Sequence, residues 1–324
     1  MPLEQGGPWV TVPAMPKLAC VTINLQGLPH LCRRTGVDER SLPPAGAAAV
    51  TRRAPERFAE LLDRKSVPGT FFVVGEDLDD GPSAMAIAEL FRLGHELGSH
   101  GFTGDRDLAR KPPAAARFEI ERGAAAIERL VGRKPAGFRA AGATLSADLL
   151  GVLEDEGFLY DASVHPSPAL WLHRAMRRRI HRAETGERPN APGLLLAPRE
   201  PYRPSHRDPY RRGSSKLVEL PVATVPVSRL PFSGAFLVSV PKPATAALYR
   251  AVRFRDFLAV ELQGYDLLDE SDGASPALSS RRRDLRIPAA AKRQRISELL
   301  DWLRDDFEVV TLEEAAARLA PVLR

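Results

Sequence analysis

Short apolar runs alternate with amphipathic helical segments along most of the chain. The first run is LACVTINL at residues 18–25, and similar strand-like runs follow at 70–75, 95–100, 157–163, 216–221, 257–262 and 307–312. Between them, apolar residues recur at helical spacing in 84–93, 114–131 and 292–304, and Ser146 is placed to cap a further helix. Strands separated by helices of this length favour a parallel sheet, and this number of units favours a closed α/β barrel.

Several polar residues fall at the carboxyl ends of the expected strands, where barrel proteins place their chemistry. They are Asn24, Gln26, His100, Arg139, Asp161 and Gln263. We expect these side chains to converge on one site.

Three stretches break the pattern. Residues 1–16 are rich in Gly and Pro and predict a loose tail, so a single domain is expected over 17–320. Residues 166–216 form an insert rich in Arg and Pro, and residues 269–284 are expected to be a surface loop. The insert's arginines are Arg177, Arg178, Arg179, Arg182, Arg203, Arg207, Arg211 and Arg212. Two readings stay open for the insert: a solvated surface loop, or a site for polyanions.

Composition narrows the class of protein. The chain has 324 residues, 44% of them hydrophobic and 27% charged, with 46 basic against 41 acidic side chains and a net charge of +5. Such a mild basic excess does not by itself indicate nucleic-acid binding. The sequence has no apolar run of membrane-spanning length and no secretory signal, so we expect a cytoplasmic protein.

Common signatures of phosphate, dinucleotide and zinc-protease sites are absent from the sequence. What remains is an ordered series of segments: VTINLQGL (21–28), TFFVVGEDL (70–78), GHELGSHGFTGDRDL (94–108), GFRAAG (137–142), GFLYDASVHPSP (157–168), LVELPVATVP (217–226), LAVELQGYDLLD (258–269) and VVTLEEA (309–315). In number, order and spacing, this series resembles the polysaccharide deacetylase family with its NodB homology fold.

The resemblance implies a distorted (β/α)7-type barrel that hydrolyses carbon–nitrogen amide bonds, usually of N-acetyl sugars. It also implies one divalent metal held by an aspartate and two histidines, a second aspartate as general base and a late histidine as general acid. The metal makes its bound water acidic enough to supply hydroxide near neutral pH.

The chain departs from this pattern at the reacting positions. Asn24 stands at the base position and Gln26 at a metal-ligand position, and an alternative register that places Leu25 and Gln26 there supplies no carboxylate either. His100 is kept, whereas Gly104 stands in place of the second histidine and Gln263 in place of the late one. Amides do not titrate and are weak zinc ligands. We therefore expect no cofactor beyond a weakly held zinc or other divalent ion at His100.

Other residues near the reacting positions match the family pattern. Arg139 matches the family's arginine that orients the catalytic carboxylate, with pairing to Asp161 as the structural alternative. Tyr160, Asp161, Ser163 and His165 lie in the segment that shapes the substrate groove, although Asp161 is also suited to capping a turn. Substitute metal ligands, if the site has been rebuilt, would come from His165, Asp105, Asp107 or Asp266.

Three hypotheses follow. The first is a catalytically impaired pseudo-deacetylase that binds a carbohydrate, either an N-acetylated glycan or a sugar nucleotide, or a protein partner. The second is an active carbohydrate deacetylase with a rewired metal site. The third is a polyanion-binding protein acting through the Arg-rich insert, whose affinity would fall steeply with salt.

Overall fold

The computed structural model describes residues 16–168, 172 and 192–323. Within them, eight strands form one sheet in the order β6-β5-β4-β3-β2-β1-β7, and β8 pairs with β1. The strands are β1 (Leu18–Leu25), β2 (Gly69–Val73), β3 (Glu96–Ser99), β4 (Gly137–Phe138), β5 (Tyr160–Asp161), β6 (Val218–Glu219), β7 (Phe257–Gln263) and β8 (Glu308–Val309). All the strand pairs are parallel.

The chain just after β6 closes the sheet into a distorted barrel. The Val222 amide donates to the carbonyl of Val164, which follows β5, and the Ala223 amide donates 2.8 Å to the carbonyl of Ala259 in β7. Val222 and Ala259 also form an isolated parallel bridge. The predicted distorted α/β barrel is therefore confirmed.

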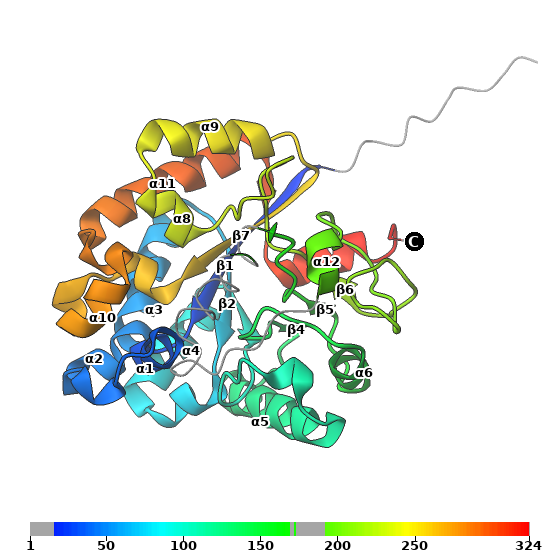
Figure 1. Ribbon diagram of the computed structural model, residues 1–324, viewed down its shortest axis with the longest axis horizontal. Helices are drawn as coiled ribbons and strands as arrows, with labels where there is room; N and C mark the ends of the chain where they lie inside the picture. The colour runs from blue at the N-terminus through cyan, green and yellow to red at the C-terminus, as the bar shows by residue number, and fades with distance from the viewer. Residues whose placement is uncertain (1–15, 169–171, 173–191, 324) are drawn as a thin grey trace, which may run out of the picture.

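Helices lie around the outside of the strands (Figure 1). They are α1 (Leu28–Thr35), α2 (Pro44–Ala47), α3 (Ala49–Arg64), α4 (Gly81–Arg92), α5 (Pro113–Val131), α6 (Ala147–Asp155), α8 (Gly234–Ser239), α9 (Lys242–Val252), α10 (Pro276–Arg281), α11 (Ala289–Asp306) and α12 (Leu312–Leu319). None of these helices combines the length and apolar character that a membrane span requires.

The two faces of β1 show how the sequence sorts side chains. Val21, Ile23 and Leu25 pack outward into a cluster that includes Phe58 of α3. The alternate residues face the barrel interior, because successive side chains of a strand point to opposite faces. Leu18 and Cys20 close the amino end together with α12, and Thr22 and Asn24 lie toward the carboxyl end.

Helix α12 forms the floor of the barrel. Leu312, Ala315 and Ala316 share a buried cluster with Cys20 and Tyr160 from the strands. This packing closes the amino end of the barrel, and the strands point their carboxyl ends away from it.

Two segments are more ordered than their composition predicts. Residues 269–284 contain helix α10, which Ser275 caps and which buries Leu278, so the expected surface loop is corrected there. In the insert, Tyr202 bridges to Glu219 of β6, and Tyr202 and Tyr210 are buried. Aromatic burial of this kind stabilises a segment that otherwise has the composition of a loop.

Candidate ligand-binding site

Polar side chains from several strand ends meet inside the carboxyl end of the barrel. We call this set the polar network; its members are Thr22, Asn24, His100, Arg139, His165, Glu261 and Gln263. Each residue is 9% exposed or less. The structure thus brings together five residues of the predicted site, which are Asn24, His100, Arg139, His165 and Gln263.

Arg139 lies at the centre of the polar network. Its Nε donates 2.8 Å to the carbonyl of Ala162, and its Nη1 donates to Thr22 Oγ1 at 2.9 Å and to Asn24 Oδ1 at 3.0 Å. The guanidinium also lies 4.2 Å from the ring centre of Phe72. Its Nη2 has no hydrogen-bond partner among the described residues. Arg139 therefore donates only to neutral oxygens and keeps one nitrogen for a further acceptor.

His100 follows β3 and contacts Arg139 through the backbone. Its Nδ1 lies 2.5 Å from the Arg139 carbonyl oxygen and must donate to it, which leaves Nε2 as an acceptor in the neutral ring. Nε2 is buried and has no partner among the described residues. Burial lowers the pKa of His100 from 6.5 to about 3, so the ring is neutral near pH 7.

Glu261 is the carboxylate of the network, and the sequence analysis missed it. His165 Nε2 lies 2.8 Å from Glu261 Oε2, and Gln263 Nε2 donates 2.9 Å to Oε1. Burial alone would raise the pKa of Glu261, but His165 and then Arg139, 3.8 Å away, hold that pKa well below its usual range. The sequence feature that could have identified it is an acidic residue inside the apolar run of β7, two residues before Gln263.

Three predicted groove residues belong to other contacts. Tyr160 donates 2.6 Å to Glu96 near the floor of the barrel. Asp161 accepts from the Ser163 amide at 3.1 Å and the Ser163 hydroxyl at 2.7 Å, which is a turn-stabilising arrangement. Asp161 also lies beside Glu219, and burial raises the pKa of both carboxyls, so this pair retains a proton.

Gln26 and Gly104 lie together beside the polar network. A Cβ atom on Gly104 would meet Val74 Cγ2 at 3.2 Å and both Gln26 Nε2 and His30 Cε1 at 3.3 Å. Helix α1 supplies His30, a residue that the sequence analysis did not select. Gln26 and Gly104, the two positions predicted to have lost ligands, are thus adjacent, and the imidazole of His30 lies beside them.

A metal of the family type does not fit these donors. Of the matched ligand positions, only His100 provides an imidazole or carboxylate, whereas zinc sites need three such protein ligands. Within the described part of the chain, no three His, Cys, Asp or Glu side chains are grouped to hold an ion. We therefore derive no reaction step through a metal, and the expectation of weak binding at His100 stays a prediction.

Of the suggested substitute ligands, His165 belongs to the polar network, whereas the three aspartates have other contacts. Asp105 pairs with Lys111, and Asp107 pairs with Arg110 at 2.6 Å. Asp266 is fully buried and accepts from the backbone amide of Gln263 at 2.8 Å. Each of these carboxylates is therefore held by a local structural contact.

The insert's arginines fall into three groups. Arg177, Arg178, Arg179 and Arg182 lie outside the described residues. Arg203 donates to the carbonyls of Ser215, Lys216 and Ala320, which makes it part of the packing. Arg207, Arg211 and Arg212 are exposed. Polyanion binding through the insert stays a prediction.

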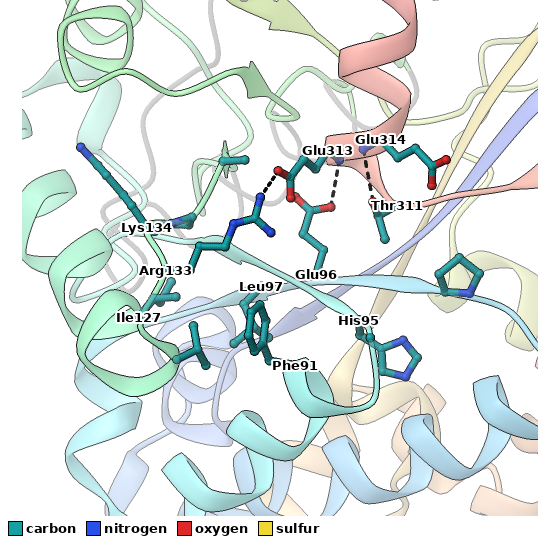
Figure 2. A pocket seen from close by; sticks show the side chains of 15 residues that line it. Phe91, His95, Glu96, Leu97, Ile127, Arg133, Lys134, Thr311, Glu313 and Glu314 are labelled. Atoms are coloured by element: carbon teal, nitrogen blue, oxygen red, sulfur yellow. Dashed lines mark hydrogen bonds and ion pairs between the residues drawn. The ribbon is translucent and has the colours of Figure 1, made fainter.

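A separate pocket of about 400 Å³ opens at the amino end of the strands. Figure 2 shows Glu96 among the lining side chains, with Glu313 above it, Arg133 to its left and the apolar Phe91 and Ile127 below. The amino end of a barrel generally serves stability, so we do not assign this pocket to the candidate site.

Comparisons with known proteins agree with the fold. Residues 46–160, about a third of the chain, match the family model described as polysaccharide deacetylase. A peptidoglycan deacetylase-like protein of Gibberella zeae is 28% identical over 110 residues, which are 33% of this chain and 32% of that protein. The match therefore spans about a third of the length of that relative.

Two solved structures share the fold over nearly the whole chain. A putative polysaccharide deacetylase from Mycobacterium smegmatis is 21% identical with a TM-score of 0.62, and the alignment covers 100% of this chain and 97% of that one. A probable polysaccharide deacetylase from Pseudomonas aeruginosa is 16% identical with a TM-score of 0.58, covering 94% and 92%. Residues 46–160 therefore resemble the polysaccharide deacetylase family, and the parallel sheet with surrounding helices is the NodB-type fold.

Proposed function

We propose that this protein binds an N-acetylated carbohydrate, as a glycan or a sugar nucleotide, at the polar network and does not hydrolyse it. The observation that carries the proposal is the replacement of the reacting groups by amides around an intact arginine. Asn24, Gln26 and Gln263 offer hydrogen bonds but neither a base nor an acid.

Two unpartnered atoms supply the recognition. Arg139 Nη2 is a donor suited to a carbonyl or hydroxyl oxygen, and unprotonated His100 Nε2 is an acceptor suited to a hydroxyl or amide N–H. An N-acetyl sugar carries both kinds of group. Buried polar atoms without partners cost about 1–3 kcal/mol each, and a ligand that pairs with them recovers that energy as affinity.

Hydrolysis lacks a general base in this arrangement. Glu261 is the network's carboxylate, and its ion pair with His165 keeps its pKa well below the usual range. A general base works best when its pKa lies near the working pH. Glu261 is therefore a poor proton acceptor.

Titration calorimetry with N-acetylglucosamine oligomers and with a nucleotide-linked N-acetyl sugar, in the presence of a chelator, tests the proposal. We expect binding that the chelator does not change and that His100→Phe weakens at least tenfold. Lys134→Gln, at the amino-end pocket, is the matched control and should bind as the wild type does.

Acetate release from the same sugars, measured with added zinc or cobalt, tests whether the protein hydrolyses them. Metal-dependent turnover by the wild type would overturn the proposal and favour the active, rewired deacetylase. Binding that persists undiminished in His100→Phe would place the carbohydrate site elsewhere.

A further inference from the structure

The space beside Gly104 is already filled by side chains from two other elements. Gly104 has a left-handed backbone with φ of 66°, and a Cβ atom there would lie 3.2–3.3 Å from Val74, Gln26 and His30. Ordinary carbon contacts lie at about 3.5–4.0 Å, so even one added carbon would be crowded on three sides. An imidazole at this position would add a ring beyond a Cβ that is already crowded by its neighbours.

His30 is held firmly in that position. It projects from helix α1, and its side chain is 10% exposed. Its Nδ1 lies 2.9 Å from Arg33 Nη2, an obligate donor, so Nδ1 accepts and the ring proton is on Nε2. Nε2 lies 3.5 Å from Glu76 Oε1. With one nitrogen engaged by a guanidinium and the other protonated, His30 is a filler of the space and not a replacement ligand.

We propose that His30 acts as a plug in the place of the missing second imidazole, so that restoring the lost ligands does not by itself restore binding of a divalent cation. The inference rests on the proposed metal-independent function and extends it. It assigns the loss of the cation site to packing by His30 as well as to the substitutions at Asn24, Gln26 and Gly104.

The test compares two variants that differ only at residue 30. The first carries N24D, Q26D and G104H; the second adds H30A. Co²⁺ is the probe, because its visible absorption reports the coordination and calorimetry gives its affinity without any activity assay. We expect the first variant to bind Co²⁺ no more tightly than the wild type, and the second to bind at least 100-fold more tightly with the absorption of a tetrahedral site.

The matched control adds H206A to the first variant, which removes an exposed histidine far along the sequence and should change nothing. Circular dichroism and thermal melting establish folding. If G104H prevents folding, N24D/Q26D and N24D/Q26D/H30A are compared with imidazole added to the solution. Free imidazole should strengthen Co²⁺ binding only where His30 has been removed.

Tight Co²⁺ binding with His30 present would overturn the proposal, and so would the absence of any gain from H30A in folded protein. Both outcomes are independent of acetate release by the wild type. A failure of the plug and a failure of the proposed function are therefore distinguishable.

Discussion

The hydrogen bonds of Glu96 at the amino end of the barrel are more complete than those of the polar network at its carboxyl end. At the amino end, the Glu96 carboxylate accepts hydrogen bonds from Tyr160 Oη, Thr70 Oγ1 and the Glu313 amide at 2.6–2.9 Å. At the carboxyl end, Arg139 Nη2 and His100 Nε2 have no partners among the described residues. Buried polar groups that have hydrogen-bond partners stabilise the fold. Buried polar groups without partners destabilise it, which is a feature of binding sites.

Glu96→Leu should have the largest effect on the free energy of unfolding. The substitution leaves Tyr160 Oη, Thr70 Oγ1 and the Glu313 amide without their acceptor, so we expect a loss of about 3–5 kcal/mol. Urea unfolding measures it. Glu313→Gln, which removes only the partly exposed pair with Arg133, is the control and should cost less than about 1 kcal/mol. An equal loss of unfolding free energy in both variants would contradict a stabilising role for the hydrogen bonds of Glu96.

The second-largest effect should be the contribution of His100 to the pH dependence of the free energy of unfolding. Its pKa is about 3 when folded and near 6.5 when unfolded, so only the unfolded chain takes up the proton as the pH falls between these values. This residue should therefore lower the free energy of unfolding by about 2 kcal/mol between pH 7 and pH 5. Urea unfolding at both pH values should show a smaller loss in His100→Gln, and an unchanged loss in His206→Gln. An identical pH slope in the wild type and His100→Gln would contradict the buried neutral state.

A comparison of Gly104→Ala with Gly94→Ala tests how crowded the space beside Gly104 is. Both glycines have positive φ, 66° and 88°, but a Cβ on Gly94 meets nothing within 4 Å. Backbone strain should cost about 1 kcal/mol in each variant, and crowding by His30 and its neighbours should add roughly 1 kcal/mol at Gly104. Thermal melting of the two variants measures the difference. Equal melting temperatures would mean that the space beside Gly104 is open.

Arg139→Met tests carbohydrate binding at the carboxyl end. The substitution leaves the Ala162 carbonyl, Thr22 Oγ1 and Asn24 Oδ1 without their donor, so a loss of about 1–3 kcal/mol in the free energy of unfolding should accompany the loss of binding. Calorimetry on the variant, at a temperature where circular dichroism shows it folded, measures the binding. Undiminished carbohydrate binding by folded Arg139→Met would contradict the assignment of Arg139 to the site.

The sequence predicted the scaffold well because its signals are local or ordered along the chain. Apolar runs of the right length located the long strands β1 and β7, and helix α11 extends the predicted 292–304 to Ala289–Asp306. The strand predicted at 307–312 was largely wrong. Only Glu308–Val309 pair with β1, and Leu312 already begins helix α12, because Thr311 caps it.

The candidate site was predictable only in part. From its residue types, the sequence predicted amides and a glycine at the positions where the resemblance implies acids and histidines. It also placed Asn24, His100, Arg139 and Gln263 at strand ends, which parallel topology brings together.

Tertiary structure alone decided which side chains complete that site. The pairing of His165 with Glu261 and the packing of His30 against Gly104 join residues that lie 96 and 74 positions apart in the printed sequence. No local pattern encodes such contacts, because they depend on strand register and on how a helix side chain packs beside a strand end. Asp161 is the contrasting case: its contact with Ser163 is local, and the sequence already indicated the turn that it stabilises.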